Sequence, residues 1–383
     1  MTLPASERGR LVSLDCMRGV AALLVCAQHL RGATLVDFAQ VESRDAWHSA
    51  FYFLTNLGHE SVMVFFVLSG FFVGGSVLRA GARFDWADYL RARALRLWCV
   101  LVPCLVLTWL CDQWLMSRAP AVLSGAFAEA WHSAPQAGAY DASWLTALGN
   151  LFFMQTIFVP VYGSNGPLWS LANEAVYYVL FPLLWVALRD GPPRTRLPHG
   201  VLAGCLIAVA PNEMRLLFAV WMLGVAVHVL HSRRVSLPRG ALAACAIAFC
   251  AAIVVSRLRL VPQAWGPLTD YLVGLSCAAF CVALVRGERA LREVTWLRRG
   301  VSWLSDISFS LYLSHFPLVL VIAASRQQAE RLQPDGAGVI AFAGWLFLLL
   351  AAGHAMWWAF ERRTPALRAW IAGLPSRRAS VNE

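Results

Sequence analysis

Ten runs of apolar residues, most of them close in length to a membrane-spanning helix, constrain the fold of this chain more than any other feature. About 20 apolar residues in helical conformation cross the hydrocarbon core of a bilayer. Charged residues make up only 14% of the chain, whereas a soluble domain has about a quarter. The sequence therefore predicts an all-α fold, a polytopic membrane helix bundle with about ten transmembrane helices. The predicted spans are Leu11–Leu30, Ser61–Leu78, Leu97–Leu115, Leu168–Leu188, Gly200–Ala210 (short, and expected to begin a few residues earlier), Leu216–Leu230, Ala241–Val255, Leu268–Val285, Val301–Ala323 and Val339–Phe360.

The arginine residues predict how these helices are oriented, because cytoplasmic loops of membrane proteins are enriched in basic residues. The segment Trp144–Pro160 is apolar but short, and its pattern alone leaves open whether it spans the membrane or is re-entrant. If it does not span, 23 arginines fall in one set of loops and 8 in the other, whereas a crossing largely removes this asymmetry. We therefore expect Trp144–Pro160 to be re-entrant or interfacial, and both termini to be cytoplasmic. The expected division is a tail at 1–10, a membrane domain at 11–365 and a second tail at 366–383.

The net charge of +10 comes from the same arginines, since the chain has no lysine. Arginines that face the cytoplasm meet anionic lipid headgroups and soluble anions. The charge thus predicts membrane lipids as partners and no nucleic acid. The ten cysteines form no CxxC pair and lie near no histidine at zinc-site spacing, so we expect no metal site.

The first predicted span, Leu11–Leu30, carries Asp15, Arg18 and His29. A charged residue at the centre of a membrane helix costs roughly 2.5–3.5 kcal/mol on insertion scales, so such residues usually have a partner or a function. Eleven residues at about 100° each return to within about 20° of the starting direction, which places Arg18 and His29 on one helix face, about 16 Å apart. One face thus presents a cation near the inner surface and an imidazole near the outer surface.

The other embedded polar residues sort by predicted depth into two groups. The outer half collects, with His29, the residues His59, Glu60, Glu174 and His315. The inner side collects, with Arg18, the run RARALR that contains Arg93 and Arg96. An imidazole beside a carboxylate is suited to general-base catalysis, and arginines bind phosphate groups bidentately. This division favours chemistry that joins two compartments.

These residues lie in blocks that together resemble the acyltransferase-3 family of bacterial multipass membrane O-acyltransferases. The blocks follow one another in family order from residue 11 to about residue 365, and the chain departs from the pattern at Ser61 and Met63. They are LDCMRGVAALLVCAQH with an Arg-x10-His pattern at Arg18 and His29, FFVLSGF at Phe65–Phe71, RARALRLW with Arg93 and Arg96, WSLANEAVYY at Trp169–Tyr178, SFSLYLSHFPL with His315, and FERRTP near Glu361.

The resemblance implies transfer of an acyl group, commonly acetyl, from cytoplasmic acyl-CoA to a hydroxyl of a surface or lipid-linked glycan, in a bacterial inner membrane. It implies no bound cofactor, with acyl-CoA as the donor substrate. We expect His29 to be the general base, aided by Glu174, and we expect Arg18, Arg93 and Arg96 to bind acyl-CoA. Further candidates for the site are Asp15, His315, Tyr178 and Ser69.

Simpler interpretations stay open for several of these residues. Arg18 can pair with Asp15 three residues earlier on the helix, and the pair Ser69-Gly70 is typical of close helix packing. Arg93 and Arg96 are also what the positive-inside rule produces, and His59 and Glu60 suit a solvated mouth. Two other functions are compatible with buried Arg, Glu and His residues: a polytopic transporter and a non-catalytic subunit of polysaccharide assembly. An acyltransferase acting on a small natural product is a further alternative.

Overall fold

The computed structural model describes residues 11–129, 131, 134–233, 236–262, 266–291, 295–326, 331–371 and 373. Within these ranges the chain is helical, and extended pairing is limited to two isolated bridges, Leu35 with Leu332 and Gln155 with Val159. The predicted all-α class is therefore confirmed. In chain order the elements are α1 (Val12–Thr34), η1 (Phe38–Gln40), α2 (Ala46–Leu54), α3 (Gly58–Ser69), η2 (Gly70–Gly74), α4 (Gly75–Ala80), η3 (Gly81–Arg83), α5 (Trp86–Arg118), α6 (Pro120–Leu123), α7 (Trp144–Leu151), α8 (Leu168–Leu188), α9 (Pro193–Val209), α10 (Asn212–Ser232), α11 (Ala241–Arg257), α12 (Gly266–Leu291), α13 (Thr295–Ser325), α14 (Gly336–Ala359), η5 (Glu361–Arg363) and α15 (Thr364–Ile371).

Nine of the ten predicted spans each correspond to one helix of the structure, and Ser61–Leu78 covers α3, η2 and α4 in succession. Seven stretches of the described chain are long and apolar enough to cross a membrane. The other three predicted spans are α1, which carries charged residues, and α9 and α11, which have 17 residues each. As expected, α9 begins several residues before Gly200. Of the two predicted tails, 1–10 lies outside the described residues and the second begins within α15.

The segment Trp144–Pro160 forms only the 8-residue helix α7, followed by an irregular turn. Eight residues of helix extend about 12 Å, far less than the roughly 30 Å of a hydrocarbon core. Asn150 closes the turn, because its side-chain nitrogen donates to the Pro160 carbonyl at 2.9 Å and its side-chain oxygen accepts from the Tyr162 N–H at 3.0 Å. The geometry agrees with the non-spanning interpretation.

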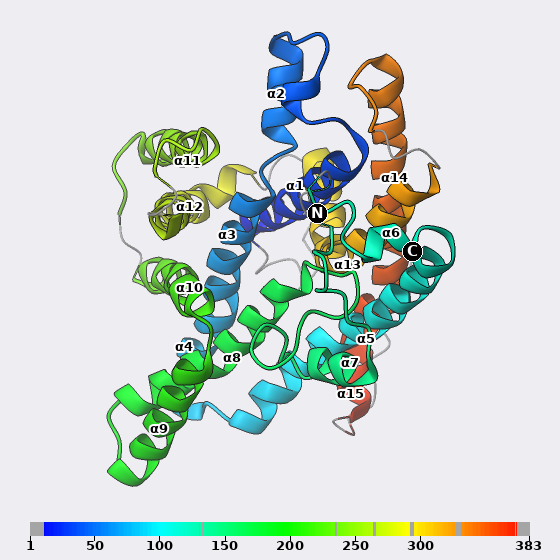
Figure 1. Cartoon of the computed structure of the whole chain (residues 1–383). Helices are drawn as coiled ribbons and strands as arrows, with labels where there is room; N and C mark the ends of the chain where they lie inside the picture. The colour runs from blue at the N-terminus through cyan, green and yellow to red at the C-terminus, as the bar shows by residue number, and fades with distance from the viewer. Residues whose placement is uncertain are drawn as a thin grey trace, which may run out of the picture.

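Helix α1 lies near the middle of the bundle, with α3 and α13 packed against it and α12 and α14 also in contact (Figure 1). Helices α10, α11 and α12 lie together on one side of this centre, and α5 lies on the other. On one side α12 contacts α1 and α3, and on the other α5 contacts α13, so polar side chains of α1 can meet neighbours on several helices.

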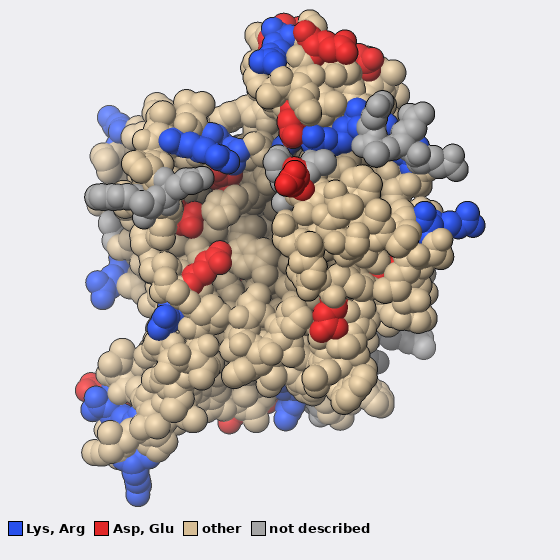
Figure 2. Space-filling view, viewed as in Figure 1, with Lys and Arg blue, Asp and Glu red and all other residues tan. Residues whose placement is uncertain are grey.

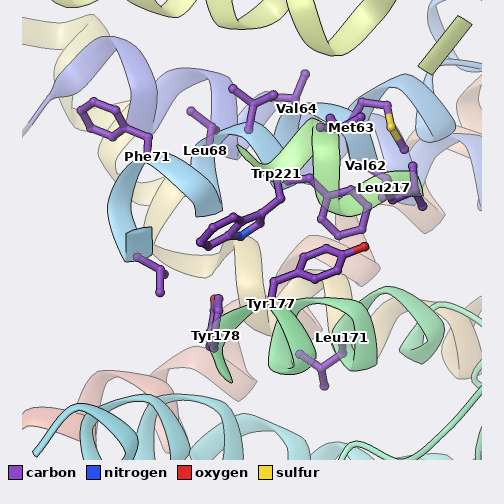
Figure 3. Packing of buried hydrophobic residues seen from close by; sticks show 14 of the residues in the cluster. Val62, Met63, Val64, Leu68, Phe71, Leu171, Tyr177, Tyr178, Leu217 and Trp221 are labelled. Carbon is purple, nitrogen blue, oxygen red and sulfur yellow. The ribbon is translucent and has the colours of Figure 1, made fainter. Parts of the chain in front are cut away.

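Helix α10 packs closely against α3 and η2. A Cβ added at Gly70 meets the carbonyl oxygen of Trp221, and a Cβ added at Gly224 meets the carbonyl oxygen of Val67. Small residues allow such backbone approach in membranes, as predicted for Ser69-Gly70. Trp221 lies between this contact and Tyr177 of α8, with its ring centroid 6.2 Å from that of Tyr177 (Figure 3). The chain continues as a π-helical turn in η2, a feature frequent at functional sites.

The outer surface of the bundle is apolar over large areas. On the face drawn in Figure 2 most of the surface is uncharged, and arginine side chains gather toward its edges. Helix α14 alone exposes Ile340, Phe347 and Leu348, the first by 74%. Apolar faces of this extent need a non-aqueous surrounding, which a lipid bilayer provides.

Candidate active site

A cavity of about 260 Å³ lies between α1, α3, η2, α5, α8 and α13. We call it the arginine cavity, because the three arginines predicted to bind acyl-CoA border it together. Its polar lining residues are Arg18, Ser69, Arg93, Arg96, Ser170, Glu174, Tyr178, Ser308 and Tyr312.

Arg18 reaches the arginine cavity with part of its charge already compensated. Its Nη2 donates to Asp15 Oδ1 at 2.8 Å and to Ser305 Oγ at 2.6 Å. The Ser305 hydroxyl also lies 3.2 Å from Asp15 Oδ1, as a donor. The pair with Asp15 reduces the cost of embedding a charge, and the guanidinium group still borders the cavity. Ser305, on α13, therefore fixes the side chain of a residue on α1.

Ser69 and Tyr178 connect Glu174 to the core in a line of hydrogen bonds. Trp221 Nε1 donates to Ser69 Oγ at 3.1 Å. The Ser69 hydroxyl reaches Tyr178 Oη at 3.4 Å, and the Tyr178 hydroxyl reaches Glu174 Oε2 at 3.4 Å. These contacts limit the rotamers of Glu174 and hold its carboxyl group at the cavity wall.

The structure places Glu174 away from its predicted partner His29. Glu174 borders the arginine cavity, where Arg93 and Arg96 interact with it electrostatically. His29 borders a different pocket and bonds to another residue. The segment before α8 is buried within the protein, with Asn165 0% exposed, so the start of α8 is packed inside the bundle.

Proline residues in two helices free carbonyl groups close to the site. Pro182 has no N–H, so the carbonyl of Tyr178, four residues earlier, lacks its helical donor. The Tyr89 hydroxyl donates to that carbonyl at 2.9 Å. The Tyr89 ring centroid also lies 5.6 Å from the guanidinium carbon of Arg93. Tyr89 thus supplies the missing donor to α8 and contacts one of the cavity arginines.

A second space, of about 290 Å³, adjoins the arginine cavity, and we call it the histidine pocket. Two residues, Val62 and Tyr312, border both spaces. The residues that line the histidine pocket are Val25, Gln28, His29, Gly58, His59, Val62, Gly166, Pro167, Trp169 and Tyr312.

His29 of α1 is paired with His315 of α13. The two rings are nearly coplanar, with an interplanar angle of 9°, and His29 Nδ1 lies 2.8 Å from His315 Nε2. His315 is 0% exposed. The other ring nitrogen of His315, Nδ1, lies 2.8 Å from the Tyr312 carbonyl oxygen and 3.1 Å from that of Leu311. The two histidines and the carbonyl groups of α13 therefore form one continuous series of hydrogen bonds.

The direction of these bonds assigns the tautomers. A carbonyl oxygen only accepts, so His315 Nδ1 carries the proton. In a neutral imidazole the second nitrogen then has a lone pair, so His315 Nε2 accepts from His29 Nδ1–H. His29 Nε2 is left with a lone pair, and the His29 ring borders the histidine pocket. This is the protonation state that a general base needs.

Asn165 holds α13 where Pro317 interrupts its hydrogen bonds. Pro317 leaves the Leu313 carbonyl, four residues earlier, without its helical donor. Asn165 Nδ2 donates to that oxygen at 2.9 Å, and Cys104 Sγ lies 2.8 Å from it. The buried loop before α8 thus fixes α13 two residues before His315.

His59 and Glu60 connect α3 to the neighbouring helices. His59 Nε2 lies 2.6 Å from Asp270 Oδ1 of α12 at the border of the histidine pocket. Glu60 is only 2% exposed, which corrects the expectation of a solvated residue. Its Oε1 accepts from the Ser256 hydroxyl at 2.7 Å and lies 3.7 Å from Arg257 Nη1. A hydroxyl and one cation, both on α11, compensate its burial.

Three residues that bear on the site escaped the sequence interpretation: Ser305, Asn165 and Tyr312. Pro317 carried a signal for Asn165, because a proline inside an apolar helix implies a freed carbonyl and hence a donor. Ser305 and Tyr312 are a serine and a tyrosine within an apolar run, and nothing in their spacing distinguishes them. Among the described residues, no group of three or more His, Cys, Asp or Glu side chains is placed to hold a metal ion.

The fold and its two adjoining spaces define a polytopic helical membrane protein with polar side chains gathered inside the bundle. A family model described as an acyltransferase domain matches residues 11–360. The chain therefore belongs to the acyltransferase-3 family and is a multi-pass membrane acyltransferase. No curated protein and no solved structure matches the chain.

Proposed function

We propose that this protein is an O-acyltransferase of the bacterial inner membrane. It transfers an acyl group, acetyl in the simplest case, from cytoplasmic acyl-CoA to a hydroxyl of a surface or lipid-linked glycan. One observation carries the proposal: the arginine cavity and the histidine pocket adjoin at Tyr312 and Val62. A phosphate-bearing donor and a hydroxyl-bearing acceptor thus have separate sites that meet within the bundle.

The arginine cavity suits the donor. Guanidinium groups bind phosphate oxygens in a bidentate manner, and Arg93 and Arg96 lie on one helix beside the cavity. Arg18 is held by Asp15 and Ser305, so it contributes a fixed positive charge. The arginine distribution predicts that this side faces the cytoplasm, where acyl-CoA is made.

The histidine pocket suits the acceptor. A neutral imidazole with an available lone pair takes the proton of a hydroxyl as the oxygen attacks. His315 and its bond to the Tyr312 carbonyl hold His29 in that tautomer. The imidazolium that forms then donates to His315 Nε2, so the dyad stabilises the charge that develops.

The reaction consists of one substitution at the thioester carbon. The acceptor oxygen forms a bond to the carbonyl carbon while its proton passes to His29 Nε2. The tetrahedral intermediate collapses with cleavage of the carbon–sulfur bond, and the CoA thiolate leaves with the bonding electron pair. The proton held by His29 passes to the sulfur, which restores the neutral dyad and yields ester and thiol.

Purified protein with radiolabelled acetyl-CoA and a hydroxyl acceptor tests the proposal. Wild-type protein is expected to produce covalently labelled acceptor, and His29→Ala is expected to abolish the labelling. His354→Ala is the matched control, because His354 contacts Trp303 and Trp357 and borders neither space. Undiminished labelling by His29→Ala contradicts the assignment of the base. Accumulation of substrate across vesicles without a labelled product indicates a transporter instead.

A further inference from the structure

We infer that Tyr312 donates the hydrogen bond that stabilises the oxyanion formed when the acceptor attacks the acyl thioester. The inference rests on the proposed acyl transfer and assigns a catalytic role to a residue outside the His29–His315 pair. An oxyanion needs a donor placed where the negative charge develops, and such preorganised donors are usually the largest single contribution to catalysis of acyl transfer.

The position of Tyr312 singles it out. The donor thioester and the acceptor hydroxyl must meet where the two spaces adjoin, and the residues that border both are Tyr312 and Val62. Val62 has no side-chain donor, whereas Tyr312 carries a phenolic hydroxyl. Its ring centroid lies 6.0 Å from that of His315. His315 is the hydrogen-bond partner of the proposed base His29, and His29 and Tyr312 both border the histidine pocket.

The backbone of Tyr312 contributes to the same centre. Its carbonyl oxygen accepts from His315 Nδ1 at 2.8 Å, which sets the tautomer of the histidine dyad. Tyr312 thus orients the base, by way of His315, through its main-chain carbonyl, and it also borders both the arginine cavity and the histidine pocket. The carbonyl group and the phenol ring are attached to the same Cα, so a shift of this residue moves both together.

Neighbouring groups hold the phenol ring in place and leave its hydroxyl with only a long acceptor contact. The ring packs edge-on against Phe65, with centroids 5.5 Å apart. Tyr312 Oη lies 2.7 Å from Ser170 Oγ, and either atom can be the donor in this bond. When the Ser170 hydroxyl donates to Tyr312 Oη, the tyrosine proton faces the Pro167 carbonyl oxygen at 3.5 Å, a long contact that a closer substrate oxygen can replace. When the thioester is absent, Ser170 can donate to the Pro167 carbonyl at 3.2 Å instead.

The electrons and protons of the step balance without any additional reactant. As the acceptor oxygen bonds to the carbonyl carbon, the π electrons of the carbonyl move to its oxygen, and the Tyr312 hydroxyl donates to that oxygen. The acceptor proton passes to His29 Nε2. When the carbonyl re-forms, the carbon–sulfur bond breaks and the thiolate leaves with its electron pair. The Tyr312 proton stays on Tyr312 throughout.

Tyr312→Phe tests the role, because it keeps the ring and removes only the hydroxyl. Loss of one oxyanion donor typically lowers kcat by about 100- to 1,000-fold, and we expect a decrease in that range with KM for acetyl-CoA changed less than about threefold. Tyr271→Phe is the control: its hydroxyl donates to the Leu216 carbonyl at 3.2 Å and it borders neither space. Ser170→Ala should lower kcat less than Tyr312→Phe, since the phenol remains.

A ligand-binding readout separates an oxyanion role from a packing role. A trifluoromethyl ketone analogue of acetyl-CoA adds water at its carbonyl carbon to give a tetrahedral hydrate, which resembles the intermediate. Its affinity should fall in Tyr312→Phe by about the same factor as kcat, while the affinity of the unreactive thioether S-ethyl-CoA should stay the same. Equal loss for both analogues, or a kcat within about threefold of wild type, overturns the inference. Absence of any transfer by the wild-type protein refutes the proposed function itself.

Discussion

Substitution of His315 gives the sharpest test of the hydrogen-bonded pair that it forms with His29. In His315→Phe an aromatic ring remains on α13, but nothing at that position accepts the His29 Nδ1 proton. His315 is 0% exposed, so water does not replace the lost acceptor easily. The carbonyls of Tyr312 and Leu311 also lose their contact with His315 Nδ1.

The magnitude follows from the hydrogen bond that is lost. A buried donor left without its partner costs about 1–3 kcal/mol. We expect this cost to disfavour the tautomer and ring orientation of His29 that catalysis needs. In that case kcat decreases by roughly 5- to 150-fold, since about 1.36 kcal/mol corresponds to a factor of ten. KM for acetyl-CoA should not change, because His315 borders neither the arginine cavity nor its arginines.

Steady-state transfer of radiolabelled acetyl groups by purified protein measures both constants. His315→Gln is the matched variant, because a glutamine side-chain oxygen can accept the His29 Nδ1 proton in place of the imidazole nitrogen. We expect its kcat to lie between those of wild type and His315→Phe. An unchanged melting temperature confirms that each variant is folded. A kcat for His315→Phe within twofold of wild type refutes the proposed orientation of His29.

Three further predictions concern donor binding and packing. Arg93→Gln and Arg96→Gln each remove a charge-assisted hydrogen bond to phosphate, about 1.5–3 kcal/mol, so KM for acetyl-CoA should rise roughly 10- to 150-fold; a lower kcat at constant KM contradicts this role. Asn165→Leu leaves a buried carbonyl without its donor and should lower the unfolding free energy by about 1–3 kcal/mol, which thermal denaturation in detergent measures. Gly224→Ala should destabilise the protein by about 1–3 kcal/mol through overpacking, whereas Gly344→Ala, whose added Cβ meets open space, should be neutral or stabilising by up to about 1 kcal/mol.

The sequence was sufficient to predict the positions of the helices, because apolar length is a local property of the chain. It was also sufficient to predict that Trp144–Pro160 does not span, since the arginine asymmetry depends only on counting loops. The shared face of Arg18 and His29 was predictable for the same reason. Both side chains lie on one regular helix, and the arginine cavity and the histidine pocket lie along it.

The partners within the site could not be predicted in this way. His29 and His315 are 286 residues apart in the chain, and only the packing of α13 on α1 brings them together. Glu174 borders the arginine cavity, whereas His29 bonds to His315. The packing of α8 against α3 and η2 decides which space the Glu174 side chain borders. Which neighbours a helix face meets is a tertiary property that apolar periodicity does not contain.

A sided measurement tests the central claim that donor and acceptor reach one centre from opposite faces. Membrane vesicles with the cytoplasmic face outward are loaded with a membrane-impermeant hydroxyl acceptor and supplied externally with radiolabelled acetyl-CoA. The two adjoining spaces predict that wild-type protein labels the enclosed acceptor, that His29→Ala does not, and that His354→Ala does. Labelling that occurs only when both substrates are on the same side of the membrane contradicts the account.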